Sequence, residues 1–210
     1  MKTNRFIYFF LYALVFGNTG VGYAQQANLV QIPETGSKTL LNSGWYARRA
    51  NEIRIDGNQL TMQPFKPDGW MKATVPGTVL TTMLDNNMFP DPEVSLNNNL
   101  IPDIYLVGRD FYTFWFVRPF EVKELEKDKQ VWLNFRGINY KAEIFLNGKR
   151  INHTTHEGMF LRQSYCITPY LKENEVNVLA VIVHPPDHPG NPYQRQIRSQ
   201  EAAAHRCPYC

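Results

Sequence analysis

The sequence predicts an all-β fold, a β-sandwich of the jelly-roll kind that carries one short helix. Short runs rich in β-branched and aromatic residues follow one another along the chain, separated by Gly, Pro and Asn. An Asn-Gly pair between two extended runs predicts a hairpin, and a single segment has the apolar spacing of a helix. Such a fold does not by itself say what the domain binds, so function has to be argued from particular residues.

Strands are predicted for four runs: 111–117 (FYTFWFV), 131–137 (VWLNFRG), 140–148 (YKAEIFLNG) and 175–185 (EVNVLAVIVHP). In the third run apolar residues alternate with Lys141 and Glu143, which predicts a strand that is buried on one face. The first and last runs are apolar on both faces, which predicts strands that are covered on both sides.

Asn147-Gly148 ends the third run, and both residues tolerate the positive φ of a type I′ turn. We therefore expect a hairpin over 140–154. The sequon Asn152-His153-Thr154 lies just beyond the turn and would matter only in a glycosylating host.

One segment, PGTVLTTMLDNNMFPDP, departs from the β pattern. Thr78 can cap a helix there, and Pro90 ends it. The apolar residues that fall on one face of this helix are Val79, Leu80, Met83 and Leu84.

The N-terminus has the pattern of a secretory signal. Lys2 and Arg5 precede the apolar run 6–17, and small residues lead to a cleavage site after Ala24. The run is shorter than a membrane span, and no later stretch is long enough, so no membrane segment is expected. We expect a protein exported to the periplasm or the extracellular space.

Four regions follow: a signal peptide at 1–24, a polar leader at 25–38, the β domain at 39–192 and a tail at 193–210. A net charge of +3 on 210 residues is too small to indicate a nucleic-acid partner. The chain has no G-x-S-x-G elbow and no Cys-Gly-x-Cys context, so no catalytic residue is assigned.

No metal site and no cofactor are expected. Three prolines in the seven residues HPPDHPG indicate a rigid turn rather than a site, and the tail motif supplies at most three of the four ligands of a zinc site. The residues concerned are His184, Asp187 and His188 in the turn, and His205, Cys207 and Cys210 in the tail.

The loop FPDPEVSLNNNLIPDIYLVGRD is the candidate carbohydrate-binding segment, because carboxylate, amide and guanidinium groups beside aromatic rings bind sugar hydroxyls. Its candidate residues are Asp91, Asn97, Asp103 and Arg109. In the alternative interpretation, the loop is solvated and its Asn and Asp residues serve turn geometry. Composition alone does not separate the two.

Several motifs in one order resemble the N-terminal sugar-binding domain of glycoside hydrolase family 2, over about 40–192. They are GWYARRA, WMKATVPGTVLTTMLDNNMFPDPEVSLNN, IPDI, GRDFYTFWFVRPF, VWLNFRGINYKAEIFLNGKRI, GMF and NVLAVIVHPPDHPGNP. The branch is that of β-mannosidases, mannosylglycoprotein endo-β-mannosidases and exo-β-glucosaminidases.

This resemblance implies a galactose-binding-like jelly roll at the front of a larger enzyme, whose barrel carries two catalytic glutamates of a retaining mechanism. The tail lacks the Gly-rich loop, the Trp-Asp-Trp-like stretch and the closing strands that the family has after HPPDHPGNP. We therefore expect the sandwich to be incomplete at the C-terminus and the tail to be out of frame or otherwise aberrant.

Two functions remain open. The chain is the sugar-binding domain fragment of a secreted retaining hydrolase acting on β-mannosides, β-glucosaminides or glycans, with the missing catalytic domains as its partner. Alternatively, it is a stand-alone carbohydrate-binding module without catalysis.

Overall fold

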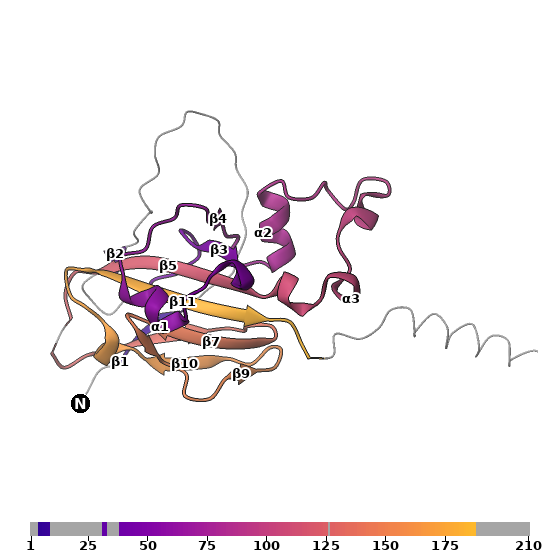
Figure 1. Ribbon diagram of the computed structural model, residues 1–210. Helices are drawn as coiled ribbons and strands as arrows, with labels where there is room; N and C mark the ends of the chain where they lie inside the picture. The colour runs from indigo at the N-terminus through magenta and orange to yellow at the C-terminus, as the bar shows by residue number, and fades with distance from the viewer. Residues whose placement is uncertain (1–3, 9–30, 33–37, 126, 188–210) are drawn as a thin grey trace, which may run out of the picture.

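The computed structural model describes residues 4–8, 31–32, 38–125 and 127–187 (Figure 1). Most of the predicted signal peptide and leader, and all of the predicted tail, lie outside these residues. In the described part, no helix is long and apolar enough to cross a membrane.

An eight-stranded sheet forms the larger layer, and its two longest strands lie at its centre (Figure 1). β11 (Val176–His184) pairs antiparallel with β5 (Phe114–Val122) on one side and with β7 (Lys141–Leu146) on the other. The remaining strands are β2 (Gln31–Ile32), β3 (Tyr46–Arg49), β4 (Met71–Lys72), β8 (Lys149–Arg150) and β9 (His156–Glu157).

A three-stranded sheet forms the second layer, in the order β1 (Asn4–Tyr8), β6 (Gln130–Phe135) and β10 (Gln163–Cys166). The main core lies between the two layers, because buried side chains of β6 join those of the large sheet in one cluster. Val131 and Leu133 of β6 thus pack with Phe120, Ile144 and Val181.

Three short α-helices accompany the sheets: α1 (Gly57–Met62), α2 (Val79–Asp85) and α3 (Ile104–Val107). α1 covers the outer face of the large sheet, where Leu60 packs with Trp115 and Phe145. Buried Met83 of α2 packs on Phe114 at the end of β5. The 3₁₀ turns are η1 (Ala50–Glu52), η2 (Asn97–Leu100), η3 (Arg109–Tyr112) and η4 (Thr168–Tyr170).

The all-β sandwich and its central strands are confirmed, and β5 and β11 are indeed covered on both faces. The hairpin is confirmed too: Asn147 and Gly148 have φ of 49° and 83° between β7 and β8. The predicted helix is α2, and Thr78 caps it by accepting a hydrogen bond from the Thr81 amide at 3.0 Å.

Two details of the prediction are wrong. The described residues form three short α-helices rather than one, and α1 and α3 were missed because they are too short to show a helical apolar period. The first predicted strand begins at Phe114, since residues 111 and 112 belong to η3. Aromatic side chains there pack beside Met83 of α2 instead of entering the sheet ladder.

Candidate functional site

A groove of about 740 Å³ opens over the inner face of the large sheet, between the end of β6 and the start of α2. Phe116 of β5 and Val181 and Val183 of β11 line it from the sheet. Alternate residues of a strand point to opposite faces, so these side chains face the small sheet while their neighbours face α1. The groove therefore exposes part of the inner core surface.

Loops after β6 and β9 form one wall, and a buried histidine joins them. The His156 Nε2 atom lies 2.8 Å from the carbonyl oxygen of Ile138 and 3.2 Å from that of Gly158. His156 is 4% exposed. A single imidazole thus fixes the positions of Arg136, Asn139 and Phe160, which line the groove beside it.

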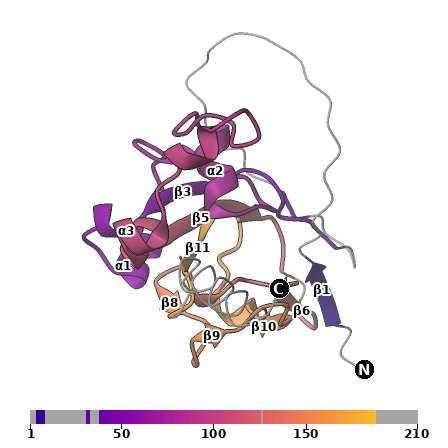
Figure 2. The ribbon, with the colours of Figure 1, turned by 90° about the vertical axis from the view of Figure 1, so that its right-hand side faces the viewer.

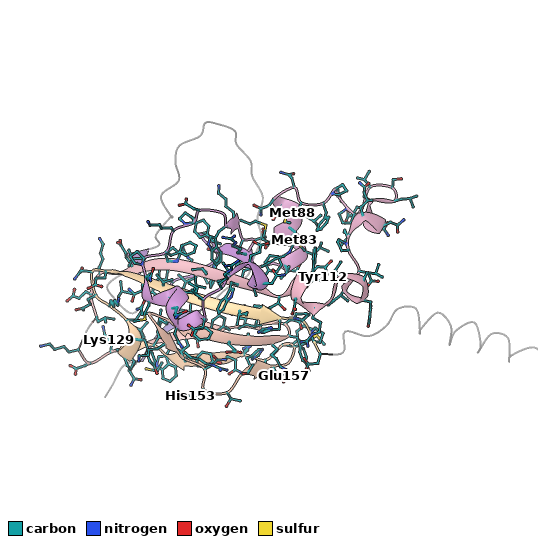
Figure 3. The ribbon with its side chains drawn as sticks, viewed as in Figure 1. Met83, Met88, Tyr112, Lys129, His153 and Glu157 are labelled. Carbon is teal, nitrogen blue, oxygen red and sulfur yellow. The ribbon has the colours of Figure 1, made fainter. Side chains whose placement is uncertain are left out.

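The opposite wall comes from α2 and from the chain between α3 and β5. Tyr112 lines the groove there, and its hydroxyl donates a hydrogen bond to the Pro102 carbonyl. Burial raises the pKa of Tyr112 above its usual value, and the negative charge of Asp103 adds to the effect. Figure 3 shows Tyr112 close to α3, at the end of the sheet away from Lys129.

Chemically, the groove suits binding rather than proton transfer. Its lining is mostly apolar and aromatic, and its polar groups include the side chains of Thr78, Tyr112, Arg136 and Asn139. No Asp or Glu belongs to the described lining. Glycoside hydrolysis by the retaining route needs two carboxyl groups about 5 Å apart. The groove can receive the apolar face of a sugar ring.

An ion-pair cluster lies where the chain leaves β11, next to Pro185 and Pro186 of the groove. The Asp187 carboxylate is 2.7 Å from Arg109 Nη2 and 3.1 Å from Lys141 Nζ, and Lys141 also lies 3.5 Å from Glu157. Figure 3 shows Glu157 at the edge of the molecule below α3.

The contacts in this cluster shift the pKa values of its side chains. The hydrogen bond from Lys141 lowers the pKa of Asp187, and the same bond raises the pKa of Lys141. Burial lowers the pKa of neighbouring His184. The negative charge of Glu143 opposes this shift, and the positive charges of Arg109 and Lys141 add to it. In the described residues, no group of His, Cys, Asp and Glu could hold a metal ion.

All four residues predicted to bind carbohydrate make contacts within the chain, and none of them belongs to the groove lining. Asp91 accepts a hydrogen bond from the Glu93 amide, and its carbonyl accepts one from Asn97 Nδ2 at 3.0 Å. Asp103 caps α3 by accepting from the Tyr105 amide. Arg109 lies elsewhere, in the Asp187 cluster.

The contacts of Asp91, Asn97 and Asp103 have the character of the turn geometry in the alternative interpretation, whereas Arg109 forms an ion pair. Sugar binding by them stays a prediction. The groove residues Tyr112, Arg136, Asn139 and Phe160 were not singled out from the sequence, although three of them lie in the runs FRGIN and GMF. The glycines of those runs could have drawn attention to these loops. Gly158, for example, has a φ of 134°, a value that few other residues adopt.

Comparison with known proteins gives consistent results. The family model described as glycosyl hydrolase 2 galactose-binding domain-like matches residues 45–209. A mannosylglycoprotein endo-beta-mannosidase of Lilium longiflorum is 50% identical over 157 residues, which are 73% of this chain and 16% of the relative. An exo-beta-D-glucosaminidase of Streptomyces avermitilis is 23% identical over 155 residues, with the same two shares.

Among solved structures, the exo-chitosanase CsxA of Amycolatopsis orientalis has a TM-score of 0.58 at 23% sequence identity. The match covers 68% of this chain and 16% of that chain, and it supports the fold alone. The chain thus spans about a sixth of the length of these two curated relatives.

Proposed function

The chain belongs to glycoside hydrolase family 2 through its galactose-binding-like domain, and from this membership we propose that it is the N-terminal sugar-binding domain of a larger exported β-glycoside hydrolase. The enzyme would cleave β-mannosides or β-glucosaminides with retention of configuration. The observation that carries this proposal is the 50% identity with the plant endo-beta-mannosidase, confined to 16% of that enzyme's length.

In this proposal the domain contributes binding, and the catalytic carboxyl groups belong to a separate barrel. A retaining mechanism needs one protonated and one ionised carboxyl group, both held on rigid elements. Among the described residues, Asp187 and Glu157 form ion pairs with Lys141 at the protein surface, where neither carboxylate lies in the groove lining.

The test is an assay of the purified chain with p-nitrophenyl β-mannoside and p-nitrophenyl β-glucosaminide. We expect no turnover above a buffer blank. Turnover that follows the folded protein through gel filtration and disappears with a substitution in this chain would overturn the proposal. Sequencing of the coding region beyond residue 192 gives a second test, since an alternative frame should encode a Gly-rich loop, strands and a barrel.

A stand-alone carbohydrate-binding module is the second candidate, and the groove is the observation that favours it. Aromatic side chains with a few polar neighbours are the usual means of binding a sugar ring. Titration calorimetry with manno-oligosaccharides tests this candidate, because a module has to bind without the rest of an enzyme. Loss of binding in Phe160→Ala but not in Leu106→Ala would place the ligand in the groove, since both side chains are more than 80% exposed and only Phe160 lines it.

Export is part of the first proposal and is tested separately. N-terminal sequencing of secreted material should begin at Gln25. A protein that remains in the cytoplasm with Met1 in place would contradict export and leave the family assignment untouched.

A further inference from the structure

β1 covers one edge of the small sheet, and cleavage of the proposed signal peptide after Ala24 would remove it. β1 pairs in parallel with β6, with Asn4 opposite Gln130 and Tyr8 opposite Asn134. Among the described residues, β6 lies between β1 and β10, so β1 alone covers this side of β6. Figure 2 shows β1 at the margin of the molecule, next to β6.

The backbone groups beneath this cover can be identified. The Val131 amide donates to Thr168 Oγ1 at 2.7 Å, and the Val131 carbonyl accepts from the Ile167 amide at 2.9 Å, so Val131 points to the β10 side. Successive residues of a strand point their amide and carbonyl groups to opposite sides. The backbone groups of Trp132 and Asn134 therefore face β1, and they lose their hydrogen-bond partners when β1 leaves.

The sequence of β6 favours pairing with an identical strand. Its six residues, QVWLNF, contain no charge, no Pro and no Gly, and most are β-branched, aromatic or apolar. Short uncharged segments of this kind are the ones that self-associate when they lie at a sheet edge. Natural proteins protect such edges with Lys, Pro or a covering segment, and here the flanking Lys129 and Arg136 lie outside the strand.

We propose that the β1-facing edge of β6 is a self-association surface, that residues 4–8 cover it in the intact chain, and that a second copy of the chain pairs with it when the cover is removed. Two β6 edges can pair antiparallel around a two-fold axis, which uses the same surface on both copies. The removal of the cover by signal peptidase rests on the proposed export, whereas the pairing itself does not.

The experiment displaces β1 without shortening the chain. Cell-free synthesis without membranes retains residues 1–210, as an intact mass confirms. The variant Phe6→Pro/Ile7→Pro removes two consecutive amides from β1, so at least one of its hydrogen bonds to β6 is lost. The matched control is Val15→Pro/Phe16→Pro, which places two prolines in the same apolar run outside β1.

Light scattering after gel filtration measures the mass, and amide hydrogen exchange reports on 130–134. We expect the intact chain and the control to be monomeric. The β1 variant should have at least twice the monomer mass, and adding Trp132→Lys should restore the monomer, because Lys on an edge strand opposes pairing. A peptide of residues 1–10 added to the β1 variant should also restore it.

Two results would overturn the proposal. One is a β1 variant that stays monomeric at the same concentration as the control. The other is association that neither Trp132→Lys nor the peptide reduces. Such association would arise from another surface, such as the apolar run or the groove, and not from the edge of β6. Because the peptide leaves β6 unaltered, it distinguishes these causes even if Trp132→Lys fails to fold.

Discussion

Asn152 heads a glycosylation sequon, yet it has a structural role. Its side chain is 1% exposed and accepts a hydrogen bond from the Ile144 amide at 2.8 Å while donating to the Ala142 carbonyl at 3.0 Å. The amide side chain thus continues the sheet ladder beside β7. A glycan on Asn152 Nδ2 is incompatible with these two hydrogen bonds. A glycosylating host should therefore yield folded protein that carries no glycan at Asn152.

We expect Asn152→Ala to destabilise the domain by about 2–4 kcal/mol, because it removes two hydrogen bonds and leaves a buried amide and a buried carbonyl unpaired. Urea unfolding of Asn152→Ala and of the control Asn58→Ala measures this loss, and the exposed Asn58 should change stability by less than about 0.5 kcal/mol. Equal effects of the two substitutions would refute the role assigned to Asn152.

Two glycines with positive φ resist a side chain for different reasons. A Cβ on Gly148 would lie 2.7 Å from Met62 Cγ, whereas a Cβ on Gly108 meets no atom within 4 Å. Gly108 has φ of 81° and ψ of 168°, a backbone region that is essentially confined to Gly and costs other residues about 1–3 kcal/mol. Gly148→Ala and Gly108→Ala should therefore both lower the melting midpoint, and a Met62→Ala background should reduce the loss for Gly148→Ala alone. Scanning calorimetry that shows the same relief at both positions would contradict the contact assigned to Gly148.

Between elements, Asp187 joins the end of β11 to η3 through Arg109 and to β7 through Lys141. Its pKa is lowered in the folded state, so its contribution to stability is present above the unfolded value of 3.8 and is lost as the pH falls through the folded value. Asp187→Asn should therefore flatten the acid limb of the stability curve below about pH 4.

Melting midpoints between about pH 6 and pH 2.5 test this dependence. Glu93→Gln is the control, since this exposed carboxylate forms no ion pair within the described residues. The role assigned to Asp187 would be contradicted if the loss of stability at low pH were unchanged in Asp187→Asn and altered in Glu93→Gln.

The elements that sequence predicted correctly depend on local signals. Strict alternation around Lys141 and Glu143 marked β7, and Asn147-Gly148 marked its turn. α1 escaped prediction because it has only six residues and begins at a glycine, and its position depends on Leu60 packing against Trp115 and Phe145. Such packing joins residues far apart in sequence, which no short window contains.

The groove escaped prediction for the same reason. His156 brings the loop at 136–139 to the loop at 158–160, and the sheet beneath them comes from β5 and β11. The sequence drew attention instead to the polar loop at 89–110, because its composition was locally conspicuous. Asp91, Asn97 and Asp103 prove to be engaged in the turns and the helix cap of that loop.

At the scale of the whole molecule, stability depends on a strand near the end of the described chain. A chain stopped after Asp187 keeps all the strands that the structure describes, whereas one stopped after Glu175 lacks β11 and separates β5 from β7. We expect the first to unfold cooperatively with the midpoint of the full chain and the second to show no cooperative transition. Circular dichroism melts of both test this, and cooperative melting of the shorter chain would mean that β5 and β7 hold the core without β11.

The central place of β11 also determines when the protein can fold during its synthesis. The ribosome makes β5 first, β7 next and β11 last of the three, but β11 lies between the other two. While residues 147–184 are being made, the nascent chain therefore carries β5 and β7 without the strand that lies between them, and their apolar side chains stay uncovered. The large sheet cannot form until β11 is made, so folding of this domain during synthesis has to wait until residue 184 has left the ribosome.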